Sequence, residues 1–270
     1  MTDLFKKQHE TVLISWEEGI TTITLNRPEF LNAMSPQLMQ DLYEVLEKVS
    51  EDGETKVVVI TGAGRAFCAG GDVAEDVAIV GEKTPFEYRE YIANFANVSK
   101  RVYWMEKPVI AAINGDCLGA GFAIALSCDI RIASEKARFG SLFINVALVP
   151  DYGMTYFLPQ VVGTSKALEL MLTGEIIDAT EAKRLGIVSS VVPHDELMKA
   201  ALELAARIAQ QPSIAIELTK KLVYQDMISN IAQHLDWETY AQELCFKSED
   251  HRESVLAFLE KRPRPKFKGK

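Results

Sequence analysis

The chain has 270 residues, of which 48% are hydrophobic and 25% are charged, as in an ordinary globular protein with a sizeable core. A net charge of −9 argues against general affinity for nucleic acid, and the sequence has no apolar run long enough to predict a membrane span. The N-terminal MTDLFKKQHE lacks the apolar core of a signal peptide, and the four cysteines form no CxxC pair. We therefore expect a cytoplasmic protein with no metal site, no disulfide framework, and neither nucleic acid nor membrane as a partner.

Strand signals dominate the first part of the chain. Residues 12–16 (VLISW) and 19–26 (GITTITLN) predict two strands, the second with the alternation of a half-buried strand. Ser35 followed by Pro36 is typical of a helix start, and the spacing of the apolar residues after it is helical. The β-branched run at 56–62 (KVVVITG) predicts a strand that is covered on both faces.

A strand, a glycine-rich turn and a helix then follow one another twice. The first turn is GAGRAFCAGGD (62–72), and a helix is predicted over roughly 85–105. The buried-strand pattern returns at 107–115 (KPVIAAING) and leads into a second turn and helix, CLGAGFAIALSCD (117–129). This order predicts an α/β fold.

The C-terminal part has a different pattern, because its β-branched strands stop near residue 194. Four consecutive stretches have helical spacing, and we predict an α/β core over 1–195 and a helical segment over 196–270. In the final KRPRPKFKGK, six of ten residues are Lys or Arg. This tail is either a solvated end or a basic cluster that meets phosphates or an acidic neighbouring subunit.

The two glycine turns can serve chemistry as well as packing. Glycine lets another group approach the backbone closely, and the start of a helix leaves amide N–H groups unpaired. Two such turns can direct two N–H donors, from Gly71 and Ala120, at one developing oxyanion. The alternative is that the glycines only allow tight turns. Neither turn matches a phosphate-binding loop, since GK[ST] and GxGxxG are absent.

Asp151 stands out because it lies among apolar residues in ALVPDYGM (147–154). One interpretation is that it caps a helix that begins near Gly153. The other is that it moves a proton, in which case apolar neighbours such as Phe143, Leu148 and Val149 should make it a better base.

Other polar residues carry weaker signals. Asp72 is expected to bond backbone groups of its own loop, and Glu75, Asp76 and Glu82 are expected to be solvated. The four histidines fall outside every motif and are expected at the surface.

Several separated motifs together resemble the crotonase (enoyl-CoA hydratase/isomerase) superfamily. They are GAGRAFCAGGD, KPVIAAINGDCLGAGFAIALSCDIRIASEKARFG, VPDYGMTYFLPQVVG and LTGEIIDATEAKRLGIVSSVVP, in this order, with AFLEKR near the end. Within the superfamily, LxPDxG followed by LPxVxG is similar to the ring-epoxide (1,2-epoxyphenylacetyl-CoA) isomerases of phenylacetate catabolism and to enoyl-CoA isomerases.

The resemblance implies a spiral of ββα units, a C-terminal helical trimerisation segment and an acyl-CoA thioester substrate. No cofactor is expected, since coenzyme A is part of the substrate. It further implies a homotrimer or a dimer of trimers. In the superfamily two backbone N–H groups hold the thioester oxygen, and these map onto Gly71 and Ala120. The coenzyme-binding positions map onto Arg27, Leu31, Ala33, Ala69, Val73, Phe258 and Lys261.

The resemblance also bears on the reaction. Hydratases of the superfamily use two glutamates, whose positions hold Ala123 and Phe143 here, so efficient hydration is not expected. Asp151 occupies the position of the acidic residue of several isomerases, and Phe143, Ala123 and Tyr152 are expected to line the acyl pocket. We therefore predict an isomerase in which one carboxylate carries the proton. Weak hydration by another carboxylate, covalent dehalogenation and a non-catalytic coenzyme-binding role stay open as alternatives.

Overall fold

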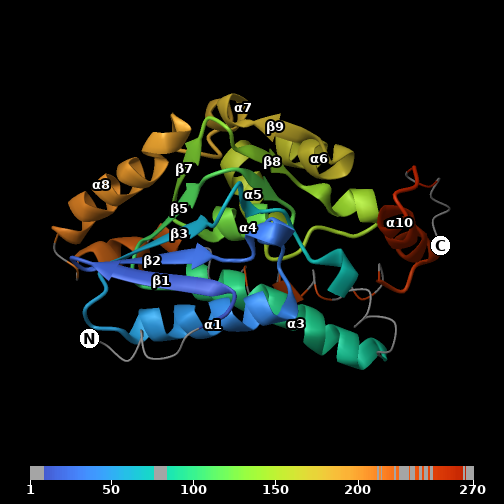
Figure 1. Cartoon of the computed structure of the whole chain (residues 1–270), viewed down its shortest axis with the longest axis horizontal. Coiled ribbons are helices and arrows are strands. Elements are labelled where there is room, and N and C mark those ends of the chain that lie inside the picture. Colours follow the sequence, from blue (N-terminus) through green and yellow to red (C-terminus); the bar gives the residue numbers. More distant parts are fainter. Residues whose placement is uncertain are drawn as a thin grey trace.

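The chain folds around two β-sheets with helices on their outer faces (Figure 1). The structure is a computed structural model, and it describes residues 9–75, 84–211, 213, 215–221, 223–224, 231, 235–236, 239, 243, 246–263 and 265. Among these residues, no helix has both the length and the apolar character needed to cross a membrane.

The larger sheet has six strands in the order β1-β2-β3-β5-β7-β10. The first two strands are antiparallel, and every other neighbouring pair in this sheet is parallel. The strands are β1 (Val12–Glu17), β2 (Ile20–Leu25), β3 (Val57–Gly62), β5 (Val109–Ile113), β7 (Ile130–Ser134) and β10 (Ser190–Val192).

The smaller sheet has the order β4-β6-β8-β9, and only β8 and β9 are antiparallel. Its strands are β4 (Ala66–Cys68), β6 (Asp116–Leu118), β8 (Arg138–Gly140) and β9 (Ile176–Asp178). The chain therefore winds as a spiral. Each of the pairs β3/β4, β5/β6 and β7/β8 places its first strand in the larger sheet and its second strand in the smaller one.

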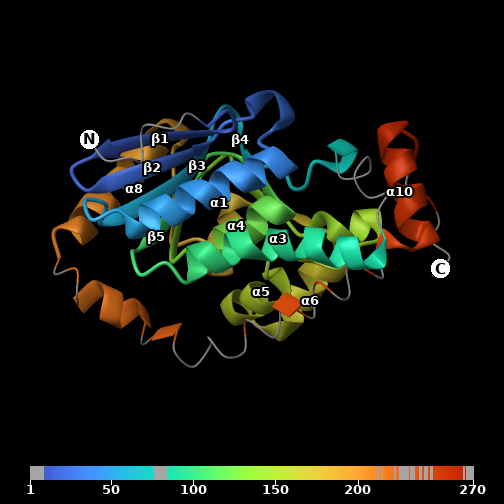
Figure 2. The ribbon, with the colours of Figure 1, turned by 90° about the horizontal axis from the view of Figure 1, so that it is seen from below.

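Helices cover both faces of the larger sheet. On one face α1 (Pro36–Glu51) and α3 (Pro85–Tyr103) pack against each other, and they run side by side in Figure 2. On the other face α8 (Leu197–Ala209) packs against β3, β5 and β7. The remaining helices are η2 (Pro28–Phe30), α4 (Ala120–Ser127), η3 (Leu142–Val146), α5 (Met154–Val162), α6 (Thr164–Thr173), α7 (Ala179–Arg184), η4 (His194–Glu196) and α10 (Glu249–Leu259).

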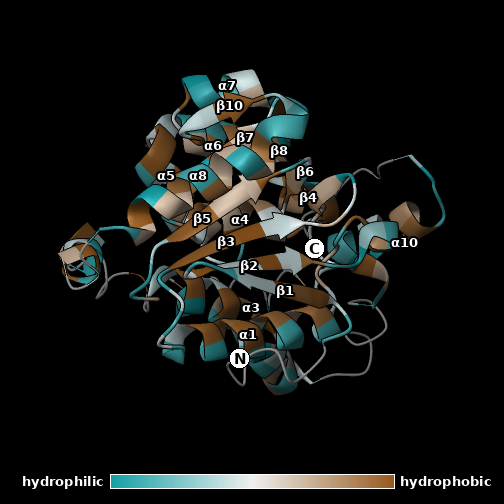
Figure 3. Ribbon diagram, turned by 60° about the vertical axis from the view of Figure 1, so that its left-hand side comes forward, coloured by the Kyte–Doolittle hydropathy of each residue, from teal (hydrophilic) through white to brown (hydrophobic). Residues whose placement is uncertain are grey.

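The side chains of β3 show why its first four positions are all apolar. Val58 and Ile60 join the core under α1 and α3, whereas Val57 and Val59 join a second core under α8. Because successive side chains of a strand point to opposite faces, a strand between two helical layers must be apolar at every position. Figure 3 shows the hydrophobic residues along β3 and β5 between these layers. The prediction of a strand covered on both faces is confirmed.

The N-terminal elements agree with their sequence signals. The hydroxyl of Ser35 accepts a hydrogen bond from the amide of Leu38, with Pro36 in the first turn, so α1 begins where the serine–proline pair predicts. The strands at 12–17 and 20–25 and the helix at 85–103 also lie where they are expected.

The C-terminal part agrees with its signals at both ends. The helical patterns at 195–210 and 248–262 correspond to η4 with α8 and to α10. In the two patterns between them, the ten described residues of 212–227 and the six described residues of 231–246 are all helical, and most of the basic tail lies outside the described residues. Since α8 packs on the sheet, the first helix of the predicted C-terminal segment lies against the core. The division at residue 195 and the trimerisation role stay predictions.

Candidate functional site

The two glycine turns lie against each other where β4 and β6 end. A Cβ atom placed on Gly119 would lie 3.4 Å from the Cα of Gly70, and one on Gly121 would lie 2.3 Å from the carbonyl oxygen of Cys68. The latter distance is shorter than any real Cβ contact, so only glycine permits this approach at position 121. Gly119 adopts φ 49° and ψ −121°, which is also a glycine conformation. Both turns are therefore shaped by close contact between backbones.

The amide of Gly71 points away from Met34, the residue with which Gly71 forms an isolated β-bridge. Met34 pairs with Gly71 as an isolated parallel bridge, in which the amide of Met34 donates to the carbonyl of Gly70 (2.7 Å) and the amide of Asp72 donates to the carbonyl of Met34 (3.1 Å). Successive amides of an extended segment point to opposite sides. Since the Asp72 amide faces Met34, the Gly71 amide faces the other way.

The second amide belongs to Ala120, the first residue of α4. The first amides of a helix have no intrahelical acceptor, and they form the positive end of the helix dipole. Among the described residues, no backbone carbonyl accepts a hydrogen bond from the amide of either Ala120 or Gly71. Both residues line the same cavity, so two amide donors from adjacent turns are available to one ligand.

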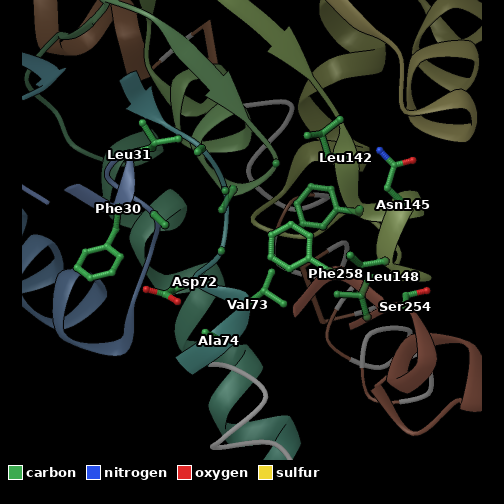
Figure 4. A pocket seen from close by; sticks show the side chains of 18 of the residues that line it. Phe30, Leu31, Asp72, Val73, Ala74, Leu142, Asn145, Leu148, Ser254 and Phe258 are labelled. Carbon is green, nitrogen blue, oxygen red and sulfur yellow. The ribbon is translucent and has the colours of Figure 1, made fainter. Parts of the chain in front are cut away.

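The cavity has a volume of about 710 Å³ and is lined mainly by apolar residues. In Figure 4, Phe30 and Leu31 lie on one side of it, and Leu142, Leu148 and Phe258 on the other, with Asp72 and Val73 between them. The second group comes from η3, the segment after it, and α10, since α10 packs on η3. A concave apolar cavity with a few polar groups is the usual form of a small-molecule site.

Asp151 lines this cavity with a side chain that is almost fully buried, since the residue is only 4% exposed. The following helix, α5, begins at Met154 with Gly153 as its N-cap residue. Asp151 lies two residues before that cap and contributes its backbone carbonyl, which accepts a hydrogen bond from the amide of Met154 (3.0 Å). The alternative interpretation of Asp151 as the N-cap residue is therefore wrong.

Aromatic rings form part of the wall next to Asp151 in the chain. Tyr152 adopts a left-handed conformation (φ 52°) and stacks on Phe95 of α3, with ring centroids 5.3 Å apart. Its hydroxyl donates to the sulfur of Met39 at 3.1 Å. Tyr152 and Phe95 both line the cavity, as does Phe143. Tyr152 is thus part of the cavity wall, and its hydroxyl already has a partner within the protein.

The cysteines near the turns are not reactive thiols. Burial raises the pKa of Cys68 to about 12, and that of Cys117 lies well above its ordinary value, again chiefly because of burial. Neither residue lines the cavity. Within the described residues, no group of three or more His, Cys, Asp or Glu side chains could hold a metal ion.

Residues 15–270 match the enoyl-CoA hydratase/isomerase family. The chain belongs to this family. It is 37% identical over 260 residues to a short-chain-enoyl-CoA hydratase of Clostridium acetobutylicum (96% of this chain, 98% of that one). It is also 37% identical over 262 residues to a 1,2-epoxyphenylacetyl-CoA isomerase of Escherichia coli (97% and 99%). The crystal structure of an enoyl-CoA hydratase from Mycobacterium avium subsp. paratuberculosis superposes with a TM-score of 0.87 at 29% identity, covering 97% of this chain and all of that one. The crotonase resemblance and fold class inferred from the sequence are thereby confirmed.

Most coenzyme positions that the family resemblance suggests lie together in the structure. Five of the seven line the cavity with the two amide donors: Leu31, Ala33, Ala69, Val73 and Phe258. Phe258 is 62% exposed at the rim, although its neighbours Ala257 and Ser254 are buried. The cavity therefore draws on η2 and the residues after it, both glycine turns and α10.

Arg27 and Lys261 do not line the cavity. Arg27 is buried, and its guanidinium is bound to Asp72, Glu75 and a backbone carbonyl. Lys261 follows α10 and adopts a left-handed backbone conformation (φ 54°) at the exposed end of that helix. The partners of the Arg27 side chain in the structure are therefore protein groups.

The two positions of the family's hydratase glutamates differ in where they lie. Phe143 lines the cavity and Ala123 does not, because Ala123 is fully buried within α4. Its amide donates to the carbonyl of Gly119 (3.1 Å), so its backbone supports the second turn. Of the three expected acyl-pocket residues, the structure brings Phe143 and Tyr152 to the cavity.

Some cavity residues carried no signal in the sequence. Phe95, Asn145, Phe246 and Ser254 line the cavity from α3, η3 and the C-terminal helices. Their spacing indicates only amphipathic helices, which do not reveal what the apolar face contacts.

The expectation that the histidines lie at the surface is wrong for His9 and His251, which are both buried. His251 donates from Nδ1 to the carbonyl of Val146 (2.8 Å), and His9 lies 3.3 Å from the carboxylate of Asp41. Each ring thus forms a polar contact with a segment that is distant in the sequence. His194 is half-buried, and His234 lies outside the described residues.

Proposed function

We propose that this chain is a cofactor-independent acyl-CoA isomerase in which Asp151 carries a proton between two carbons of the acyl group. The observation that carries the proposal is that a buried carboxylate lines the same cavity as two amide donors, Gly71 and Ala120. The substrate class follows from family membership, whose relatives are named for enoyl-CoA and epoxyphenylacetyl-CoA substrates. Coenzyme A enters as part of the substrate.

The proposed mechanism depends on where negative charge develops when the acyl group loses a proton. When a proton leaves the acyl carbon next to the thioester, or the carbon at the far end of a conjugated double bond, negative charge develops on the thioester oxygen. Two preorganised N–H donors stabilise that charge, and each such donor contributes about 10²–10³-fold to the rate. Asp151 removes the proton, holds it as the carboxylic acid and returns it two carbons along. The double bond moves, and the carboxylate is regenerated.

A single carboxylate suits isomerisation better than hydration. Addition of water needs one group to activate the water and another to protonate the α carbon, whereas isomerisation uses one group twice. The described cavity lining contains three carboxylates, Glu29, Asp72 and Asp151. Asp72 is bound to Arg27, and Glu29 is exposed on η2. Of the three, Asp151 has the most deeply buried position in the apolar wall of the cavity, at 4% exposure.

Hydration is the second candidate, and the names of several relatives favour it. A short-chain-enoyl-CoA hydratase and a crotonyl-CoA hydratase are 37% and 34% identical to this chain. Against it stand Ala123 and Phe143 at the positions of the two hydratase glutamates.

A panel of acyl-CoA substrates separates the two candidates. Crotonyl-CoA reports hydration through loss of its conjugated absorbance, and 3-enoyl-CoA and phenylacetyl-derived epoxide substrates report isomerisation. We expect turnover of an isomerisation substrate by the wild type and its loss in Asp151→Asn. Rapid hydration of crotonyl-CoA that Asp151→Asn leaves unchanged would refute the proposal. Coenzyme binding without turnover of any substrate in the panel would favour a non-catalytic role.

We further propose that the protein assembles as a homotrimer or a dimer of trimers, as the family resemblance suggests. Light scattering should then give a mass of three or six times the 30.0 kDa of one chain. A monomeric mass at working concentration would refute this.

A further inference from the structure

Arg27 is a buried cation that ties the first glycine turn to the loop before α1. Its Nη1 donates to a carboxylate oxygen of Asp72 (2.9 Å) and to the carbonyl of Ala33 (2.7 Å). Its Nη2 donates to Glu75 (3.2 Å), and its guanidinium carbon lies 4.6 Å from the centre of the Phe30 ring. One side chain thus joins residues from both loops.

The contacts of Arg27 surround Gly71. Asp72 follows Gly71 directly, and Ala33 precedes Met34, the residue that pairs with Gly71. Three backbone hydrogen bonds complete this contact: the amide of Ala69 donates to the carbonyl of Leu31, and Met34 exchanges bonds with Gly70 and Asp72. The Gly71 amide is thus held in its direction by bonds on both sides, although it makes none of them itself.

The charged pair adds to these backbone bonds, in a turn whose glycines contribute little rigidity of their own. Gly70 and Gly71 have no side chains, and glycine loses more conformational freedom on ordering than any other residue. Rotation of the peptide between them would turn the Gly71 amide away from the cavity. The side chains of Arg27 and Asp72 are about nine-tenths buried, at 10% and 11% exposure, so solvent screens their interaction little.

We propose that Arg27 and Asp72 are positioning residues that fix the direction of the Gly71 amide toward the thioester oxygen. Arg27 then acts on the reacting carbonyl through the loop and does not bind the coenzyme. The proposal rests on the proposed acyl-CoA chemistry only in that a thioester oxygen occupies the site, and it holds for isomerisation and hydration alike. It replaces the coenzyme-binding role expected for Arg27 from the family resemblance.

The test compares Arg27→Lys, Arg27→Met and Asp72→Asn with the wild type. Arg27→Lys keeps the charge and loses the forked geometry, and Asp72→Asn keeps the shape and loses the charge, so both remain informative if Arg27→Met does not fold. Arg184→Met is the matched control, because Arg184 forms an exposed pair with Glu181 on α7, away from the cavity. Thermal unfolding establishes that each variant is folded.

Three measurements distinguish a role in positioning the Gly71 amide from a role in binding coenzyme A. The first is the infrared stretching frequency of a bound acyl-CoA labelled with ¹³C at the thioester carbonyl, which falls when amide donors bind the oxygen. The second is the dissociation constant of free coenzyme A, which has no thioester. The third is the division of the rate effect between kcat and KM for whichever acyl-CoA is turned over.

We expect all three Arg27 and Asp72 variants to raise the carbonyl frequency toward its value in water. We also expect kcat to fall by on the order of 10-fold to 10²-fold, as for a misplaced catalytic group. The affinity for free coenzyme A should stay within about twofold of wild type. A variant that combines Arg27→Met with Asp72→Asn should be no slower than the slower of the two single variants. A tenfold loss of coenzyme affinity with an unchanged carbonyl frequency would overturn the proposal. If no substrate is isomerised but the carbonyl frequency still depends on Arg27, the proposed function fails and this inference stands.

Discussion

Gly119 shows how a single residue sets the geometry of the site. It lies before the first residue of α4 with φ 49° and ψ −121°, a conformation that side-chain-bearing residues rarely adopt. A Cβ atom there would lie 3.4 Å from the Cα of Gly70 in the other turn. The absence of a side chain therefore allows both the backbone conformation and the contact between the two amide-bearing turns.

We expect Gly119→Ala to lower the free energy of unfolding by about 1–3 kcal/mol, because alanine is strained in this conformation. The same strain should tilt the start of α4 and lower kcat. Gly53→Ala is the control, since a Cβ at Gly53 meets nothing within 4 Å. Urea unfolding of both variants measures the effect, and equal stabilities would show that position 119 carries no strain.

Asp151 is the residue on which the proposed reaction depends. Asp151→Asn removes the base and nearly preserves the volume of the side chain, so we expect kcat to fall by about 10²–10⁴-fold. Asp116→Asn is a suitable control, because Asp116 pairs with Arg138 and does not line the cavity. Steady-state assays with an isomerisable acyl-CoA give kcat for Asp151→Asn and for Asp116→Asn. An Asp151→Asn enzyme as fast as the control variant would contradict the proposed role.

The buried thiols give a prediction about chemical reactivity. Burial raises the pKa of both Cys68 and Cys128 to about 12, so both are neutral thiols at any pH well below that value. Because the thiolate is the nucleophile, iodoacetamide at pH 8 should leave both unmodified in the native protein and alkylate both in urea. Peptide mass spectrometry after quenching measures this. Modification of Cys68 in the native state would show that the first turn opens.

At the scale of elements, α10 closes the cavity by packing on η3, and His251 lies at their contact. Its Nδ1 donates to the carbonyl of Val146, and its ring meets Phe246 edge-on at 4.8 Å. Phe246 and Val146 both line the cavity, so this contact joins the C-terminal helix to the wall of the cavity.

Burial lowers the pKa of His251 below its ordinary value of 6.5, although the hydrogen bond to Val146 acts in the opposite direction. Below about pH 6.5 the unfolded chain therefore binds a proton at this residue that the folded chain does not yet bind. We expect the stability of the wild type to fall relative to His251→Gln as the pH decreases from 7.5 to 5.5. Urea unfolding across that range measures the difference, and a constant difference would contradict the lowered pKa.

At the scale of the whole molecule, the larger sheet separates two cores. One lies under α1 and α3 and extends to the walls of the cavity, and the other lies under α8. The second core contains four residues of α8, three of which are alanines, so the helix lies close to the sheet: Leu197, Ala201, Ala205 and Ala209. None of these four residues lines the cavity.

This separation predicts that stability and activity respond differently to changes in α8. Ala201 is fully buried, and Ala201→Leu inserts three carbon atoms between α8 and the sheet. We expect a loss of about 1–3 kcal/mol in the free energy of unfolding, with kcat of the folded enzyme unchanged. Chemical unfolding and steady-state assays at low temperature test both parts. A large fall in kcat would show that the two cores are coupled.

The sequence by itself determined the elements that rest on local chemistry. The β-branched runs at β3 and β5 predict buried strands because such side chains suit a sheet covered on both faces, and Ser35-Pro36 predicts the start of α1 because the cap acts within one turn. The strands β7 to β10 and the helices α6 and α7 were not predicted, because strands of three to five residues and helices of six to ten residues have few positions in which to show a period. The order of the motifs also determined family membership.

Only the tertiary structure decided which groups face the cavity. The direction of the Gly71 amide depends on Met34, and the partners of Arg27 are Asp72 and Glu75, all distant in the sequence. The residues around Asp151 are also compatible with a helix cap, and only the structure places the N-cap at Gly153 and buries the Asp151 side chain. The physical reason is that a local pattern reports the conformation of a few neighbouring residues, whereas burial and hydrogen-bond partners are set by segments that meet only when the chain is folded.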